Sequence, residues 1–249
     1  VSLEKVYPNV RMPISYRHRF IRELIEWKPD VIHSWGVEYH HALAMVNAAE
    51  AEGKRSHMVA SIQGLCRFLA EHYTDGLPEK VCRGTTFRDY LRKDNILQQQ
   101  EKFVLRGQLE TRAMEKLHHV IGRTDWDRAK AMAIHPGITY HFCNETLREN
   151  FYEGHWDYSR CKRHSVFASS CSYPIKGFHK LLEALVPVVA RYPDTKVYVA
   201  GNRCAFRQMT GLKRKLMDLA PDYDWYVQSL IERYGLRDNL VFLGYLSEE

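Results

Sequence analysis

Short apolar runs alternate along the chain with longer stretches in which apolar residues recur every three or four positions. The short runs predict buried strands, at 31–33, 57–62, 119–122, 165–168, 196–200 and 240–243. The longer stretches predict helices, at 16–27, 37–51, 98–116, 125–132, 177–190, 210–219 and 225–234. Strands that alternate with helices are typical of βαβ units around a parallel sheet, so we expect an α/β protein.

Two stretches interrupt this alternation. Residues 65–95 hold a Gly-Leu-Pro turn and few regular repeats, which predicts a long excursion with short helices. Residues 141–156 lack a clean period, and a basic run follows them at 160–164. We place a domain boundary here, which gives a first domain at 1–158 and a second at 159–249.

The composition excludes several classes of protein. With 45% hydrophobic and 27% charged residues, the 249-residue chain has the composition of a soluble globular protein. No apolar run approaches the ~18 residues of a membrane span, and the first residues lack the basic-then-apolar order of a signal peptide. The six cysteines are scattered without a C-x-x-C pair, which argues against a zinc site and a disulfide framework. We therefore expect reduced thiols and a cytoplasmic protein.

The positive charge is concentrated in one segment. The net charge of the chain is +6, while basic residues outnumber acidic ones by ten between Arg160 and Lys215. A basic segment of this kind suits a diphosphate ligand or an anionic membrane surface. No aromatic-interleaved RNA motif and no DNA-reading helix accompanies it, so we expect no nucleic-acid partner.

The pair Lys176-Gly177 lies between the strand at 165–168 and the helix that follows. A lysine brings a point charge, and the start of a helix brings free N–H groups and the positive end of the dipole. This turn therefore suits a phosphate or diphosphate. The alternative is that the lysine is only a solvated charge, because such pairs are common before helices.

Other candidate residues follow from the rule that ligands bind beyond the carboxyl ends of parallel strands. The loops in these positions are His33 to Gly36, Gln63-Gly64, Arg123-Thr124 and Gly201-Asn202. Simpler roles remain open for some of them. The histidine could be a buried, hydrogen-bonded residue at a strand end, and the threonine or Asp125 could cap a helix, which would leave the arginine in solvent.

The runs S-Y-P-I-K-G-F-H-K-L-L-E-A-L and Y-P-D-T-K-V-Y-V-A-G resemble the start of the donor domain of retaining family 4 (group 1) glycosyltransferases. The resemblance implies a GT-B fold, with two Rossmann-like parallel-sheet domains facing a cleft. It implies that Lys176 binds the diphosphate of a nucleotide-sugar. The family's usual second cation is an arginine about five residues earlier, where this chain has Ser169-Ser170-Cys171. The further donor-binding residues that the resemblance implies are Ser170, Gly177, Gly201, Asn202 and Leu246.

Three other segments, P-D-V-I-H-S-W-G, S-I-Q-G and V-I-G-R-T-D-W-D, are similar to acceptor-domain segments of this family. The acceptor-side residues that they imply are His33, Gln63, Gly64, Arg123 and Thr124. Many relatives have a histidine where this chain has Gln63. A glutamine hydrogen-bonds hydroxyl groups but exchanges no proton near neutral pH, so we interpret it as a substrate contact rather than a base.

The resemblance implies transfer of a sugar, with retention, from a nucleotide-diphosphate-sugar to a glycan or lipid-linked acceptor. The nucleotide-sugar is a substrate, so we expect no cofactor, and we expect no bound metal. A lipid-linked acceptor would bring the protein to the inner face of the membrane.

In the family, V-F-L-G-Y-L-S-E-E lies mid-domain, so we expect a fragment that lacks both ends, has no certain catalytic residue and is inactive as given. The alternatives are a catalytically inactive interaction module and a nucleotide-sugar epimerase of the same fold. A NAD-dependent dehydrogenase ranks low, because no G-x-G-x-x-G follows a strand.

Overall fold

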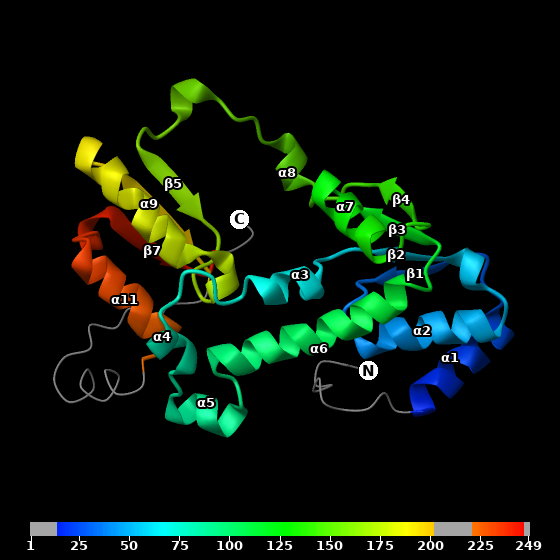
Figure 1. Ribbon diagram of the computed structural model, residues 1–249. Coiled ribbons are helices and arrows are strands. Elements are labelled where there is room, and N and C mark those ends of the chain that lie inside the picture. The colour runs from blue at the N-terminus through cyan, green and yellow to red at the C-terminus, as the bar shows by residue number, and fades with distance from the viewer. Residues whose placement is uncertain (1–13, 202–220, 247–249) are drawn as a thin grey trace. The chain divides into compact units, whose positions relative to one another are not determined.

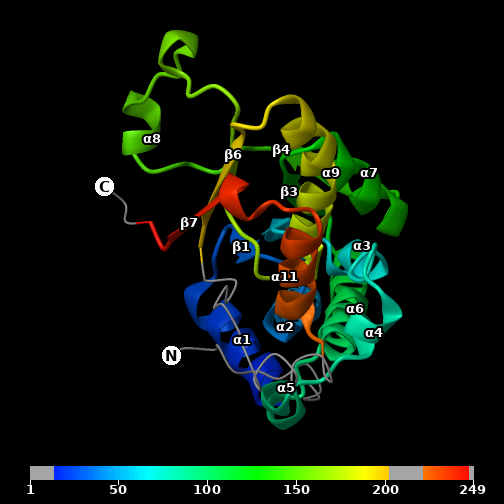
Figure 2. The same cartoon turned by 90° about the vertical axis from the view of Figure 1, so that its left-hand side faces the viewer.

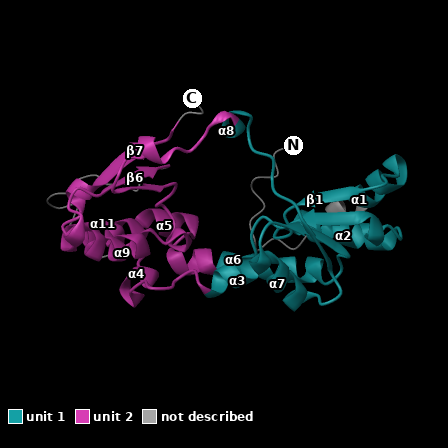
Figure 3. Cartoon of the chain, turned by 90° about the horizontal axis from the view of Figure 1, so that it is seen from above, with its two compact units in different colours: residues 1–71, 101–152 teal, residues 72–100, 153–249 magenta. Residues whose placement is uncertain are grey.

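The computed structural model describes residues 14–201 and 221–246 (Figure 1). They form an α/β protein with two parallel sheets, one of four strands and one of three. The chain divides into two compact units, Val1–Glu71 with Glu101–Tyr152, and His72–Gln100 with Glu153–Glu249 (Figure 3). The sequence pattern places one boundary at 158/159, whereas residues 72–100 group with the second unit.

The sheet of the first unit has the order β1-β2-β3-β4, and all its neighbouring strands are parallel. Its strands are β1 (Ile32–Trp35), β2 (Met58–Ser61), β3 (His119–Gly122) and β4 (Thr139–Phe142). The helices near these strands in the chain are α1 (Ile14–Trp27), α2 (His40–Ala51), η1 (Arg55–His57), α3 (Cys66–Glu71), α6 (Ile96–Met114), α7 (Asp125–Ile134) and α8 (Asn150–Glu153).

The core of this unit follows from the alternation of side chains along the strands. Met58 and Ala60 on β2 and Val120 on β3 are buried in one cluster with the apolar residues of α2 and α6. The long helix α6 contributes Met114, which is fully buried. The sheet is therefore anchored by one face to its helices.

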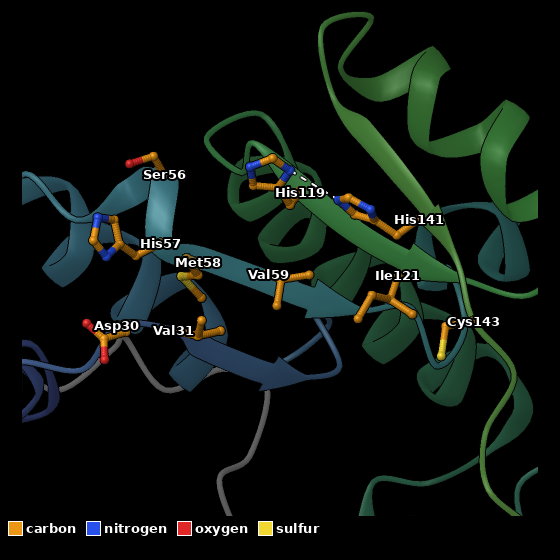
Figure 4. Close-up of a pocket in the computed structure, with 10 residues that line it drawn as sticks. All are labelled: Asp30, Val31, Ser56, His57, Met58, Val59, His119, Ile121, His141 and Cys143. Carbon is orange, nitrogen blue, oxygen red and sulfur yellow. Dashed lines mark hydrogen bonds between the residues drawn. The ribbon is translucent and has the colours of Figure 1, made fainter.

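The residues between those core positions belong to the opposite face of the sheet. Val59, His119, Ile121 and His141 line an open hollow of about 530 Å³ there (Figure 4). The rings of the two histidines are hydrogen-bonded, with His141 Nε2 3.2 Å from His119 Nδ1. None of the site residues predicted from the sequence lines this hollow.

The sheet of the second unit has the order β5-β6-β7 and is also parallel. Its strands are β5 (Ser165–Ala168), β6 (Lys196–Ala200) and β7 (Leu240–Gly244). The helices of this unit are α4 (Glu79–Arg83), α5 (Phe87–Arg92), η2 (Tyr158–Arg160), η3 (Pro174–Lys176), α9 (Phe178–Arg191), α11 (Tyr223–Arg233) and η4 (Arg237–Asn239). Both α9 and α11 lie against one face of the sheet (Figure 2). Apolar residues at helical spacing, including Phe178, Leu182 and Leu185, are buried there.

Specific contacts explain why residues 72–100 group with the second unit. The carbonyl oxygen of Asp75 lies 3.0 Å from His179 Nε2 on α9. The ammonium of Lys80 lies 5.7 Å from the centre of the Trp225 ring on α11. A Cβ at Gly84 would collide with the backbone of Pro221, so this glycine allows a close approach of two chain segments. These contacts join residues far apart in sequence and leave no periodic pattern.

The predicted strands at 119–122, 165–168 and 196–200 are confirmed with these bounds. The strand β4 was not predicted. It is the outermost strand of the described sheet and three of its four side chains are exposed, so its sequence shows no apolar run. The helix predicted at 210–219 lies outside the described residues. No helix in the described ranges is long and apolar enough to span a bilayer.

The expectation that all thiols are reduced is wrong. Cys171 is disulfide-bonded. It is almost fully buried, just beyond β5. The described cysteines that are free are Cys66, Cys82, Cys143 and Cys161.

Candidate functional site

The carboxyl ends of β1, β2 and β3 lie along the same edge of the first unit's sheet, because all three strands are parallel. Ladder-type hydrogen bonds continue beyond the strands. The N–H of Gly36 donates to Ser61 O at 3.0 Å, and the N–H of Ile62 donates to Ile121 O at 2.8 Å. The loops that carry Gln63 and Arg123 therefore leave the sheet at the same end, whereas His33 lies within β1.

Two of the predicted residues, Gln63 and Arg123, contact the same carboxylate. Arg123 Nη1 lies 2.9 Å from Glu145 Oε1, and Gln63 Nε2 donates to the same oxygen at 3.0 Å. Arg123 Nη2 also donates to Ile62 O at 3.3 Å. We call Gln63, Arg123 and Glu145 the strand-end cluster. Glu145 lies 82 residues from Gln63 in an irregular stretch, so no sequence signal pointed to it.

His33 lies within β1, paired with Val59 of β2, and makes different contacts. Its Nε2 is 2.8 Å from the hydroxyl oxygen of Ser61 on the neighbouring strand. Its ring centre lies 4.9 Å from the ring of Trp35, whose side chain is largely exposed. The interpretation of His33 as a hydrogen-bonded residue is confirmed, but it lies inside β1 rather than at the end of the strand, and its side chain is exposed rather than buried.

Thr124 caps the helix that follows β3. Its hydroxyl oxygen accepts from the N–H of Asp127, and Asp127 accepts in return from the N–H of Thr124, which forms a capping box. Asp127 also accepts from the N–H of Arg123 at 2.9 Å. The alternative role of Thr124 as a helix cap is therefore confirmed. The accompanying expectation that Arg123 would extend into solvent is wrong, because its guanidinium is paired with Glu145.

A buried carboxylate supports the loop that carries Gln63 and Gly64. Glu110 on α6 accepts from the backbone N–H of Cys66 at 2.8 Å and from that of Arg67 at 3.3 Å. Burial raises the pKa of the Glu110 carboxyl to about 7, although both hydrogen bonds act in the opposite direction. The sequence held a sign that Glu110 is buried. It lies three residues before Ala113, so both side chains fall on the apolar side of α6.

In the second unit, Lys176 ends the short helix η3 and Gly177 precedes the 14-residue helix α9. Gly177 has φ +70°, a left-handed conformation that a glycine adopts without strain. A Cβ there would meet nothing within 4 Å, so the space beside the start of α9 is open. Lys176 is exposed, and no hydrogen bond or ion pair joins its side chain to any described residue.

The structure also brings together loops at the carboxyl ends of β5, β6 and β7. Gly201 has φ +99°, and a Cβ on it would lie 3.1 Å from the carbonyl oxygen of Ser169 and 4.0 Å from Ser170 Cα. The N–H of Gly201 donates to Gly244 O at 2.8 Å. Leu246, beyond that glycine, is exposed. The predicted residue Asn202 lies outside the described residues.

His179 lies two residues after Gly177, in the first turn of α9. The sequence did not predict its burial, but only 2% of its surface is exposed. Its Nδ1 lies 3.1 Å from the hydroxyl oxygen of Tyr223, and its Nε2 lies 3.0 Å from Asp75 O. Because a carbonyl only accepts, Nε2 carries the proton and Nδ1 accepts from the tyrosine. Burial lowers the pKa of His179 and raises that of Tyr223.

No protein-family model and no curated protein sequence matches this chain. Over the ranges that the structure describes, no three histidine, cysteine or acidic side chains are grouped so that they could hold a metal ion. The case for function therefore depends on the loops at the ends of the two parallel sheets.

Proposed function

We propose that this protein is a retaining glycosyltransferase that takes a sugar from a nucleotide-diphosphate-sugar and transfers it to a glycan or lipid-linked acceptor. In this proposal each parallel sheet belongs to a Rossmann-like domain of a GT-B enzyme. Two parallel sheets with helices between their strands are compatible with this fold. Gln63 and Arg123 of the first unit and Gly201 of the second also follow the carboxyl ends of parallel strands, where such sheets bind ligands.

The observation that carries the proposal is the position of Lys176 at the start of α9. The helix is long enough to present a dipole of useful size, and its first turn is next to an open space. When the bond between sugar and diphosphate lengthens, negative charge grows on the departing diphosphate. A lysine ammonium and the positive end of a helix stabilise this charge without a metal ion.

The two units would contribute different parts of the reaction. Lys176, Gly177, Ser170 and Gly201 of the second unit would hold the donor. The strand-end cluster and His33 of the first unit would contact the acceptor. The protein would act in the cytoplasm, and with a lipid-linked acceptor it would work at the inner face of the membrane.

The experiment is a comparison of nucleotide binding by the wild-type chain and Lys176→Ala. Calorimetry with uridine, guanosine and adenosine diphosphates and their sugar conjugates measures the affinity. Loss of a charge-assisted contact costs about 1.5–3 kcal/mol, so we expect the best ligand to bind about 10- to 100-fold more weakly to the variant. Lys180→Ala is the matched control, because Lys180 lies on the same helix but pairs with Glu183.

An unchanged affinity of Lys176→Ala, or a wild-type chain that binds no nucleotide-sugar, would contradict the proposal. Proton NMR of the products with and without a sugar acceptor then distinguishes the possible activities. Transfer to the acceptor supports the proposal, whereas an epimerised donor favours the epimerase.

A further inference from the structure

The charges of the strand-end cluster indicate which acceptors it can bind. Arg123 is its only cation, and the carboxylate of Glu145 compensates it at 2.9 Å. A second carboxylate, that of Asp127, accepts from the backbone N–H of the same arginine at 2.9 Å. The positive charge that an anionic ligand needs is therefore already neutralised within the protein.

The start of α7 offers no substitute for that charge. The capping box of Thr124 and Asp127 already occupies N–H groups there, and Asp125 adds another acidic residue to the first turn. An anion at this helix start would face acidic side chains rather than free donors. This distinguishes the turn after β3 from the turn at Lys176.

The cluster still has hydrogen-bonding groups to offer. Both contacts of the Glu145 carboxylate use Oε1, which leaves Oε2 without a hydrogen-bond partner among the described residues. The carbonyl oxygen of the Gln63 side chain is likewise without a described partner. The side chains of Arg123 and Glu145 are 33% and 42% exposed, so a ligand can reach them.

We propose that the strand-end cluster binds an uncharged, hydroxyl-rich acceptor, and that Glu145 is the residue that excludes acidic sugars. This inference rests on the proposed function. A sugar hydroxyl both donates and accepts, so it can donate to Glu145 Oε2 and accept from an N–H of Arg123. The carboxylate group of a uronate only accepts at neutral pH, and it would have to break the ion pair and approach Glu145 against like charge.

The experiment compares neutral disaccharides with matched disaccharides that carry a uronic acid. Saturation-transfer NMR with the whole chain measures their dissociation constants. We expect wild type to bind the neutral sugars at least tenfold more tightly. Glu145→Gln keeps the shape of the side chain but frees the charge of Arg123, so we expect the preference to shift at least tenfold towards the uronate. The double variant Arg123→Gln/Glu145→Gln should lose this gain.

Glu149→Gln is the matched control, because Glu149 is exposed in the same segment and its carboxylate has no described partner. It should keep the preference of wild type. The inference is overturned if wild type prefers the uronate, if it binds neither sugar, or if Glu145→Gln leaves the ratio unchanged. Calorimetry with the nucleoside diphosphate on the same samples separates the two proposals. Intact donor binding with an unchanged sugar preference overturns this inference alone, whereas absent donor binding overturns the proposed function.

Discussion

Glu110 Oε2 accepts a hydrogen bond from the backbone N–H of Cys66 at 2.8 Å, and none of the glutamate's surface reaches solvent. This contact joins the start of α3 to the carboxyl-terminal part of α6. A glycine one turn earlier makes the approach close, because a Cβ at Gly107 would lie 2.6 Å from Arg67 Cα. The loop that carries Gln63 is thus stabilised by a hydrogen bond between its following helix and a fully buried carboxylate.

This carboxylate predicts a distinct pH dependence of stability. The pKa of Glu110 is about 7 in the folded protein and 4.5 in its ordinary state, so the folded chain binds more protons between these values. Its contribution to stability is therefore lost as the pH rises through that window, by up to about 3 kcal/mol. Urea unfolding at pH 5 and pH 8 measures the free energy of unfolding. Its difference between the two pH values should be smaller for Glu110→Gln than for wild type. Glu101→Gln, on the exposed side of the same helix, should behave as wild type.

Equal pH dependence in wild type and Glu110→Gln would show that this carboxyl titrates normally. A Glu110→Leu variant, which removes the acceptor as well, should be less stable than Glu110→Gln because the buried N–H of Cys66 and the part-buried N–H of Arg67 would lose their partner.

His179 predicts a pH effect of the opposite sign in the second unit. Burial lowers its pKa below 6.5, so under mildly acidic conditions the unfolded chain takes up a proton that the folded chain does not. Stability should fall as the pH drops below about 6.5. The charged groups that act on the ring are Lys180, which also lowers the pKa, and Glu183, which opposes it.

His179→Gln keeps a donor for Asp75 O and removes the titration, so denaturation midpoints between pH 5 and 7.5 should vary less than in wild type. Tyr223→Phe removes the hydroxyl that faces Nδ1 and should cost about 1–3 kcal/mol. A Tyr223→Phe protein as stable as wild type would mean that this buried contact contributes nothing.

Gly201→Ala should destabilise the second unit. The left-handed φ of +99° disfavours alanine, and its Cβ would lie 3.1 Å from the carbonyl oxygen of Ser169. Together these effects cost about 1–3 kcal/mol. Gly154→Ala is the control, because a Cβ at Gly154 meets nothing within 4 Å and its φ lies outside the left-handed region. Similar melting temperatures of the two variants would contradict the prediction.

The free cysteines should differ in reactivity. Burial raises the pKa of the Cys66 thiol to about 12 and also raises that of Cys82, so little thiolate forms at neutral pH. Cys143 and Cys161 are exposed. Brief labelling with iodoacetamide, followed by peptide mass spectrometry, should modify the exposed pair in the folded protein and all four only after denaturation. Early labelling of Cys66 would show that α3 opens readily.

Much of the fold could be predicted from local pattern. The apolar runs at 119–122, 165–168 and 196–200 become strands with those bounds, because strands inside a parallel sheet read as short apolar runs between turn residues. The sequence Thr-Tyr-His-Phe at β4 gave no such signal, since most of that strand is exposed. The grouping of residues 72–100 with the second unit was equally hidden, because it depends on single contacts such as His179 with Asp75.

For the candidate functional residues, too, the sequence predicted one part and the structure was needed for the other. By itself the sequence determined which loops follow parallel strands, and so which residues, such as Gln63, Arg123 and Lys176, stand at the sheet ends. Only the tertiary structure decided that Glu145 neutralises Arg123 while Lys176 has no partner in the described ranges. The spacing of apolar residues shows which positions face the core, because buried positions recur with the period of the helix or strand. The pairing of charges on loops does not repeat, since it depends on where distant segments of the chain come together.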